Sequence, residues 1–348
     1  MNTNNFIDTY NSNFLPIDTI EKICMVDADD ASVLGGGRRH EYLDFIKKNY
    51  KLLVLYYYEE FNNSYKFDDI LKYCLDIKLP LYIFTRNIIF KKFFNNKYGK
   101  IENIWIQDSQ LVFDTLNFVD VPKKKFNKEY NFNVDKDINL LFLYFNRKPN
   151  RDFIIQQLYN RNELYDSKNY ISFHNFLGDV SITKYENKHK KYATETNLDF
   201  DFLRELKIVP NHIEIGNQLE TQEESFFLHA RSKFNIICES VFGYDIDENS
   251  YDYHNFVLTK KTILPLIYKN VFFIHEYNNM FSTELKNIGF KMFFDNIDDF
   301  FSNMNDEFYY LESTQEILNH NRKLVFDYIL NSRFDFLNEL KLIVDDLQ

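Results

Sequence analysis

Short apolar runs alternate with segments of helical periodicity in the first part of the chain. Three runs rich in aliphatic and aromatic residues predict buried strands, at Ile20 to Val26, Lys51 to Tyr58 and Leu79 to Phe84. The intervening segments predict helices, at Glu41 to Asn49 and Phe67 to Ile77, and a further strand is predicted within Trp105 to Phe113. Strands that alternate with helices are typical of a parallel sheet covered by helices.

The same alternation returns after a polar, basic segment from Pro122 to Asp137, which lacks periodicity and is the predicted interdomain linker. Strands are predicted beyond it at Leu140 to Phe145, Tyr170 to Phe173, Phe234 to Cys238 and Val271 to Ile274. Helices are predicted at Asp152 to Tyr159, from Thr262, and at Ile297 to Met304. The polar stretch from Gly178 to about Leu198 is interpreted as a loop over a cleft.

The C-terminal part predicts two helices. Ser313-Thr314-Gln315-Glu316 fits a capping box that opens a long helix, and a last helix is predicted from Phe334 to Leu347. With 348 residues, the chain is long enough for two domains that each bury a core. We therefore predict domains at 1–130 and 138–312, followed by C-terminal helices at 313–348.

Composition limits the compartment and the partners. The three cysteines, Cys24, Cys74 and Cys238, are scattered within apolar runs and are interpreted as buried thiols of a reducing cytoplasm. The start of the chain lacks the pattern of a signal peptide, and no apolar run approaches the roughly 18 residues that span a bilayer. We therefore expect a cytoplasmic protein without a membrane partner. Many Asn, Lys, Ile, Tyr and Phe residues beside 8 Gly and 6 Pro suggest AT-rich coding, as in a phage, a virus or an AT-rich bacterium. A viral protein would lie in the host cytoplasm.

The formal net charge of −11 disfavours an electrostatically held nucleic acid or anionic membrane. Two basic runs, Pro122 to Lys128 and Lys184 to Lys191, are either local patches for such a partner or solvated loops.

Two blocks in the second half share motifs with a known family. The first is Leu141-Phe142-Leu143-Tyr144-Phe145-Asn146-Arg147-Lys148-Pro149-Asn150-Arg151, with Tyr170-Ile171-Ser172-Phe173 behind it. The second is Val257-Leu258-Thr259-Lys260-Lys261-Thr262-Ile263-Leu264-Pro265-Leu266, followed by an apolar strand and by Leu285 to Phe290. Together they resemble the fucosyltransferase-like glycosyltransferases, most closely those of phages and large DNA viruses, over about residues 140 to 295.

The resemblance implies a GT-B arrangement, in which two Rossmann-like domains face a cleft. The donor, a nucleotide-diphosphate sugar, would bind the C-terminal half, and the hydroxyl acceptor would bind the N-terminal half. No metal or other cofactor would be required. The acceptor would be a glycan or a modified base in DNA, because viral relatives use both.

Positive groups in the two blocks are the candidate donor-binding residues. Arg147 and Arg151 follow a strand, where a guanidinium can hold a phosphate through two hydrogen bonds; a surface ion pair is the alternative. Thr259, Lys260, Lys261 and Thr262 open a helix, whose free N–H groups and positive end favour a diphosphate. Lys261 corresponds to the family's Lys. Glu239 is either an acceptor for ribose hydroxyls or a structural cap.

A glycine-rich segment after the first predicted strand is a further candidate for the diphosphate. Gly35, Gly36 and Gly37 allow close approach of the backbone, and Arg38 follows them at the start of a helix. The alternative is a flexible turn with surface arginines.

An inverting transfer needs a base on the acceptor hydroxyl. Glu59 and Glu60 end a predicted strand and are the first candidates, and Asp27, Asp29, Asp30 and His40 compete with them. The residues leave inversion and retention equally open.

Two further alternatives follow from single features. Lys260 stands where the family has Glu, which suggests a catalytically inactive binding protein with the same fold. Asp27-Ala28-Asp29-Asp30 also has the Asp-x-Asp pattern of haloacid-dehalogenase-like phosphatases and of GT-A enzymes, but the surrounding residues fit both poorly. The eight His show no metal-ligand spacing, so no metal site is predicted.

Overall fold

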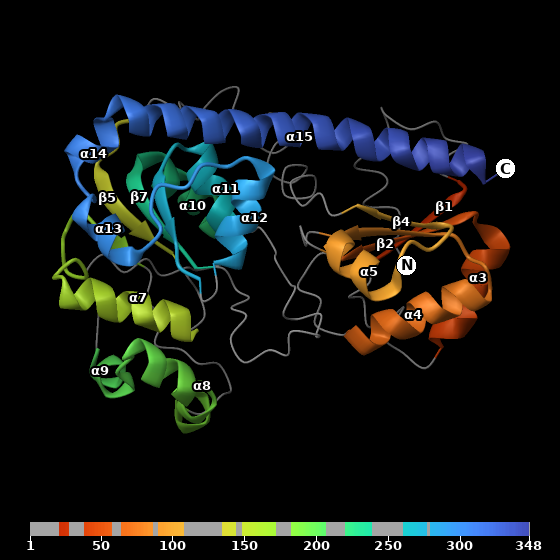
Figure 1. Ribbon diagram of the computed structural model, residues 1–348, viewed down its shortest axis with the longest axis horizontal. Coiled ribbons are helices and arrows are strands. Elements are labelled where there is room, and N and C mark those ends of the chain that lie inside the picture. The colour runs from red at the N-terminus through yellow and green to blue at the C-terminus, as the bar shows by residue number, and fades with distance from the viewer. Residues whose placement is uncertain are drawn as a thin grey trace. The chain divides into compact units, whose positions relative to one another are not determined.

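The protein is described by a computed structural model. It describes residues 21–27, 38–57, 64–85, 90–107, 134–143, 148–171, 182–206, 220–238, 260–276 and 279–347. The chain divides into two compact units (Figure 1). Unit 1 comprises Met1–Asp120, Asp245–Leu258 and Asp327–Gln348, and unit 2 comprises Val121–Tyr244 and Thr259–Phe326.

Unit 1 contains a four-stranded parallel sheet in the order β1-β2-β3-β4. Its strands are β1 (Ile23–Asp27), β2 (Leu52–Tyr57), β3 (Leu81–Thr85) and β4 (Ile104–Gln107). The helices between them are α3 (Arg39–Asn49), α4 (Ser64–Asp76) and α5 (Phe90–Tyr98). The alternation expected from the sequence is therefore confirmed in this unit.

The strands of unit 1 bury both of their faces. In β2, Leu53 and Leu55 pack with the apolar residues of α3, α4 and α5, whereas Leu52 and Val54 face the other way. That second face is covered by the end of the C-terminal helix, through Leu340, Ile343 and Val344. Side chains that alternate between two covered faces explain why these strands are continuous apolar runs in the sequence.

Unit 2 contains a second four-stranded parallel sheet, in the order β6-β5-β7-β8. Its strands are β5 (Ile138–Phe142), β6 (Tyr170–Ile171), β7 (Ser232–Ile237) and β8 (Val271–Ile274). Its helices are α7 (Pro149–Asn160), α8 (Ile182–Thr196), α9 (Phe200–Glu205), α10 (Glu220–Arg231), α11 (Lys260–Ile267), α12 (Met280–Ile288), α13 (Ile297–Ser302) and α14 (Asp306–Tyr310). The protein is thus a mixed α/β structure with two parallel sheets.

An aromatic core joins one face of the second sheet to its helices. Phe234 of β7 meets Phe300 of α13 edge to face, with ring centroids 6.2 Å apart, and Phe273 of β8 lies 5.8 Å from the same ring. Ile154 and Leu158 of α7 belong to the same core. This packing fixes α7 against the sheet and thereby positions the first turn of α7.

The loop predicted from Gly178 to Leu198 is wrong over most of its length, because α8 spans Ile182–Thr196. Tyr185, Tyr192 and Ala193 are buried along one side of this helix, which is too few apolar positions for a clear periodic signal. The lysines of the 184–191 run, such as Lys188 between the two buried tyrosines, are exposed. That run therefore belongs to a helix and not to a loop, and its lysines lie on the exposed side.

The C-terminal region also differs from the expectation. A single helix, α15 (Glu312–Asp346), replaces the two predicted helices, and it begins one residue before Ser313, the predicted N-cap. Its residues as far as Phe326 belong to unit 2 and those from Asp327 to unit 1. A helix that packs on unit 2 at its start and on unit 1 at its end shows no single apolar stripe, so its continuity was not evident. Helix α5 was not predicted at all.

Candidate functional site

The carboxyl edge of the second sheet carries the candidate site. β5 ends at Phe142 and is followed in the chain by α7, and β8 ends at Ile274 and is followed by His275. Because all four strands are parallel, these ends lie at one edge of the sheet. Ligands of open α/β sheets bind at this edge.

The first turn of α7 is buried and polar. Pro149 occupies the first helical position, and the backbone N–H groups of Arg151 and Asp152 both donate to the Lys148 carbonyl at 2.9 Å. Arg151 is only 2% exposed, and Asn150 and Asp152 are buried beside it. The helix starts three residues earlier than predicted, so Arg151 lies within its first turn. A buried guanidinium at a helix N-terminus is suited to an anion.

Helix α8 makes a polar contact with this turn. The hydroxyl of Tyr185 donates to Asp152 Oδ2 at 2.9 Å, and both residues are buried. Asn150 Oδ1 is also buried, and among the described residues it has no hydrogen-bond partner. The first turn of α7 therefore offers a cation and an acceptor oxygen side by side in sequence.

His275 lies at the end of β8, and its ring contacts residues from two helices. Its Nε2 is 3.3 Å from the Tyr192 hydroxyl of α8, and its ring stacks on Phe153 of α7, with centroids 5.0 Å apart and planes at 18°. Burial lowers the pKa of His275 to about 4, although the residue keeps part of its surface accessible. The imidazole is therefore neutral at physiological pH.

His275 was missed in the sequence, and so were Tyr185 and Tyr192. The signal for His275 was present, because it directly follows the apolar run Val271 to Ile274. The rule that selected Arg147 and Arg151, a polar residue just after a buried strand, selects it equally. The two tyrosines have no such signal, because the polar segment around them predicts a loop.

The predicted helix opening at Thr262 is confirmed by α11, which begins at Lys260. Thr262 is fully buried, whereas Lys261 is partly exposed. Pro265 lies inside this helix of eight residues. Arg151 and Lys261 are thus both placed in unit 2.

Glu276, next to His275, caps a helix. Its carboxylate accepts the backbone N–H groups of Phe281 and Ser282, at 2.6 and 2.9 Å, and so caps the start of α12.

In unit 1, Arg38 and His40 lie at the start of α3. Arg38 is exposed and precedes the helix without a side-chain capping bond. His40 is half exposed; it stacks on Tyr73 of α4 with centroids 3.9 Å apart, and its Nε2 is 3.4 Å from Asp69 Oδ2. Arg39 forms an ion pair with the same carboxylate. These contacts hold His40 between α3 and α4.

Several candidates lie outside the described residues, and their roles stay predictions. They are Asp27 (side chain only), Asp29, Asp30, Gly35, Gly36, Gly37, Glu59, Glu60, Arg147, Glu239 and Thr259. The side chain of Lys260 and the basic run from Pro122 to Lys128 also lie outside them.

A second polar cluster lies at the opposite, amino edge of the sheet in unit 2. Lys136 Nζ, just before β5, donates to the carbonyls of Ser232 at 2.6 Å and Tyr268 at 2.8 Å. Burial, with the nearby charges of Lys269 and Arg322, lowers the pKa of Lys136 to about 7. The two carbonyls follow the ends of α10 and α11, so Lys136 satisfies two helix C-termini.

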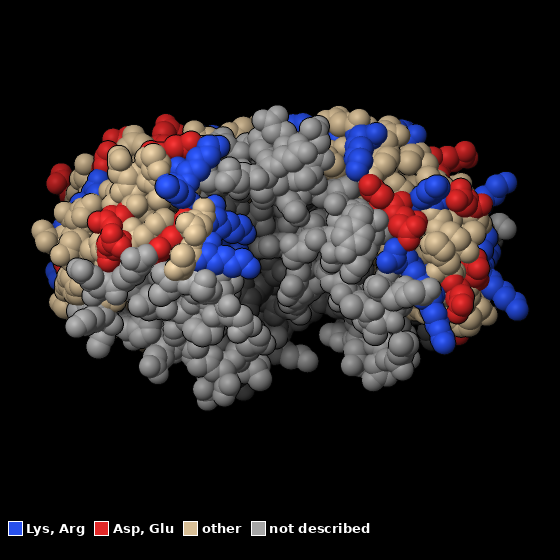
Figure 2. All heavy atoms as spheres, turned by 90° about the horizontal axis from the view of Figure 1, so that it is seen from below, with Lys and Arg blue, Asp and Glu red and all other residues tan. Residues whose placement is uncertain are grey.

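The described residues include neither a candidate metal cluster nor a membrane-spanning helix. They contain no group of three or more His, Cys, Asp or Glu side chains that could hold a metal ion. Within the same ranges, no helix has both the length and the apolar composition needed to cross a membrane. All three cysteines are buried, as the sequence predicted, and none of them is in a disulfide bond. On the face in Figure 2, acidic and basic side chains both occur over the described part of each unit.

Comparison of the chain with known proteins gives no match to a family model, a curated protein or a solved structure.

Proposed function

We propose that the protein is a glycosyltransferase of the GT-B type, which moves a sugar from a nucleotide-diphosphate donor to a hydroxyl acceptor. The proposal comes from the resemblance of residues 140 to 295 to fucosyltransferase-like enzymes. Its main structural support is Arg151, a buried guanidinium in the first turn of α7 at the carboxyl edge of a parallel sheet. Two parallel sheets, one in each unit, are compatible with two Rossmann-like domains.

In this function Arg151 binds the donor diphosphate and stabilises it as the leaving group. Negative charge builds up on the diphosphate while the glycosidic bond breaks, and a preorganised cation in a site of low dielectric constant lowers the energy of that state. The start of α7 adds the positive end of its helix dipole. Lys261, in the first turn of α11, and Arg147 are assigned to the same diphosphate from the sequence.

The acceptor is a glycan or a modified base in DNA. The base that removes its proton is assigned to Glu59 or Glu60, with Asp29 and His40 as the next candidates. His40 is held by Tyr73 and Asp69, so as a base it would act from the α3–α4 surface.

Calorimetry with a panel of nucleoside diphosphates and nucleotide sugars tests the donor site. Arg151→Lys keeps the charge but loses the two-pronged guanidinium, and we expect it to weaken binding about 10- to 100-fold, as for a lost charged hydrogen bond. Arg161→Lys is the matched control, because Arg161 lies at the other end of α7, where it pairs with Asp298. Equal affinities for the parent and Arg151→Lys would remove Arg151 from the site.

Product release from the same panel separates a catalyst from an inactive binding protein, the alternative that Lys260 suggests. A glycosyltransferase hydrolyses its donor at least slowly without an acceptor and transfers the sugar when one is supplied. Donor binding without any hydrolysis or transfer would favour the binding protein.

A further inference from the structure

The ring of His275 is held by contacts that leave one nitrogen available. Tyr192 lies at Nε2, Phe153 stacks on the face of the ring, and the backbone N–H donates to Ile237 at 2.9 Å in continuation of the β7–β8 ladder. Nδ1 has no hydrogen-bond partner in the part of the chain that the structure describes. A ring held at Nε2 and on one face, on a backbone anchored to the sheet, presents that nitrogen in one orientation.

The same edge of the sheet contains Asn150, whose buried Oδ1 also lacks a partner among the described residues. Asn150 lies three positions before Phe153 on α7, and residues at this spacing share one face of a helix. The ring of Phe153 stacks on His275, so Asn150 lies one turn nearer the helix start on the face that meets the imidazole.

We propose that His275, through Nδ1, and Asn150, through Oδ1, form a subsite for an uncharged, hydroxyl-bearing part of the nucleotide-sugar donor. This inference rests on the proposed function and adds to it a second set of contacts beside the diphosphate. The hydroxyl belongs either to the ribose or to the transferred sugar.

The chemistry of the group favours a hydroxyl. If the Tyr192 hydroxyl donates to Nε2, Nδ1 carries the proton and donates; if Nε2 donates, Nδ1 accepts. A hydroxyl matches either tautomer because it both donates and accepts. The neutral imidazole gives no attraction to a phosphate, which is left to Arg151, and its low pKa makes it a poor proton acceptor at neutral pH.

Two amide substitutions test which nitrogen binds the ligand. The carboxamide of His275→Asn lies near the position of Nδ1, and that of His275→Gln lies near Nε2. We expect His275→Asn to keep the donor affinity within about threefold, and His275→Gln to lose at least about tenfold. Tyr192→Phe, which removes only the partner of Nε2, is the control and should lose less than His275→Gln.

The ligand panel distinguishes the two sources of the hydroxyl. Loss of affinity for both the nucleoside diphosphate and the nucleotide sugar in His275→Gln assigns the hydroxyl to the ribose. Loss for the nucleotide sugar alone assigns it to the transferred sugar. Nitrogen-15 NMR of the imidazole in the parent protein needs no folded variant, and we expect the Nδ1 resonance of His275 to move when the donor is added.

The inference and the proposed function fail in different ways. If the parent binds the donor, and Arg151→Lys weakens this binding while His275→Gln leaves it unchanged, only the subsite is overturned. The subsite is equally overturned if His275→Gln retains affinity and His275→Asn loses it, because the Tyr192 contact is then what matters. If the parent binds no member of the panel, both fall.

Discussion

Tyr185 of α8 donates a hydrogen bond to Asp152 of α7, with 2.9 Å between the phenolic oxygen and Oδ2. The contact joins a helix that the sequence did not predict to the turn that carries Arg151. Both residues are buried, so the position of α8 and the geometry of this turn depend on each other.

Tyr185→Phe should therefore destabilise the protein. The substitution removes one donor from a buried carboxylate, and hydrogen bonds to charged groups contribute about 1.5–3 kcal/mol to the free energy of unfolding. Tyr159→Phe is the control, because Tyr159 lies on α7 and is 43% exposed. Loss of its hydroxyl should change the free energy of unfolding by less than about 0.5 kcal/mol. Urea unfolding measures both. Equal stability of the two variants would mean that the Tyr185 contact contributes nothing.

His275 makes the stability depend on acid pH. Its pKa in the folded state is about 4, below the ordinary value of 6.5, so between these values the unfolded chain binds a proton that the folded protein does not. The free energy of unfolding should fall as the pH drops from 6.5 towards 4, by on the order of 3 kcal/mol from this group. In His275→Asn the fall over this window should be smaller by that amount. An unchanged pH profile in the variant would contradict the buried, neutral state.

The sequence predicted the two sheets because their strands are buried on both faces. Val271 to Ile274 and Leu81 to Phe84 are continuous apolar runs, and such runs specify a strand without help from distant residues. In unit 2, the sequence selected polar candidates such as Arg151 and Lys261 only where a family motif marked them, and their roles stay predictions. His275 and Tyr192 are 83 positions apart in sequence, and only the packing of α8 on α7 brings them together.

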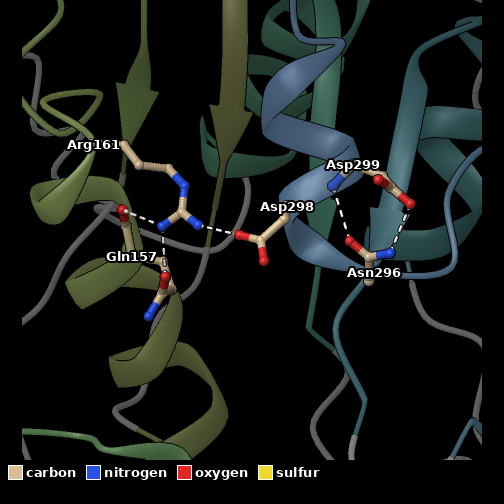
Figure 3. Close-up of polar contacts among 5 residues, drawn as sticks. All are labelled: Gln157, Arg161, Asn296, Asp298 and Asp299. Atoms are coloured by element: carbon tan, nitrogen blue, oxygen red, sulfur yellow. Dashed lines mark hydrogen bonds and ion pairs between the residues drawn. The ribbon is translucent and has the colours of Figure 1, made fainter.

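An exposed ion pair joins helix α13 to the end of α7, and a side-chain cap closes the start of α13 (Figure 3). Arg161 pairs with Asp298, and its guanidinium lies 4.8 Å above the ring of Phe301. At the start of α13, Asn296 Oδ1 accepts the backbone N–H of Asp299 at 2.9 Å. The first contact is between exposed or partly exposed side chains, whereas the second satisfies a helix N-terminus.

The Asn296 cap should contribute more to the free energy of unfolding than the Arg161–Asp298 ion pair. Asn296→Ala leaves a helix N–H without its acceptor and should cost about 1 kcal/mol, while Asn296→Asp restores an acceptor and should recover most of it. Asp298→Asn should cost less than about 1 kcal/mol, because its carboxylate is 78% exposed and screened by water. Chemical denaturation of the three variants gives the order, and a larger loss in Asp298→Asn than in Asn296→Ala would reverse this interpretation.

Lys136 should make the stability rise with pH on the alkaline side. Burial, with Lys269 and Arg322 nearby, lowers its pKa to about 7 from the ordinary value of 10.5. Between these values the unfolded chain holds a proton that the folded protein has lost, so the free energy of unfolding increases with pH across this window. In Lys136→Met the increase between pH 7 and about pH 10 should be smaller, whatever the variant's absolute stability after losing its bonds to Ser232 and Tyr268. Lys323→Met is the matched control, since Lys323 is exposed on α15 and should leave the parental profile in place. Urea unfolding at several pH values measures these profiles. Parallel curves of the free energy of unfolding against pH for the parent and Lys136→Met would show that the ammonium stays charged, held by the two helix-end carbonyls.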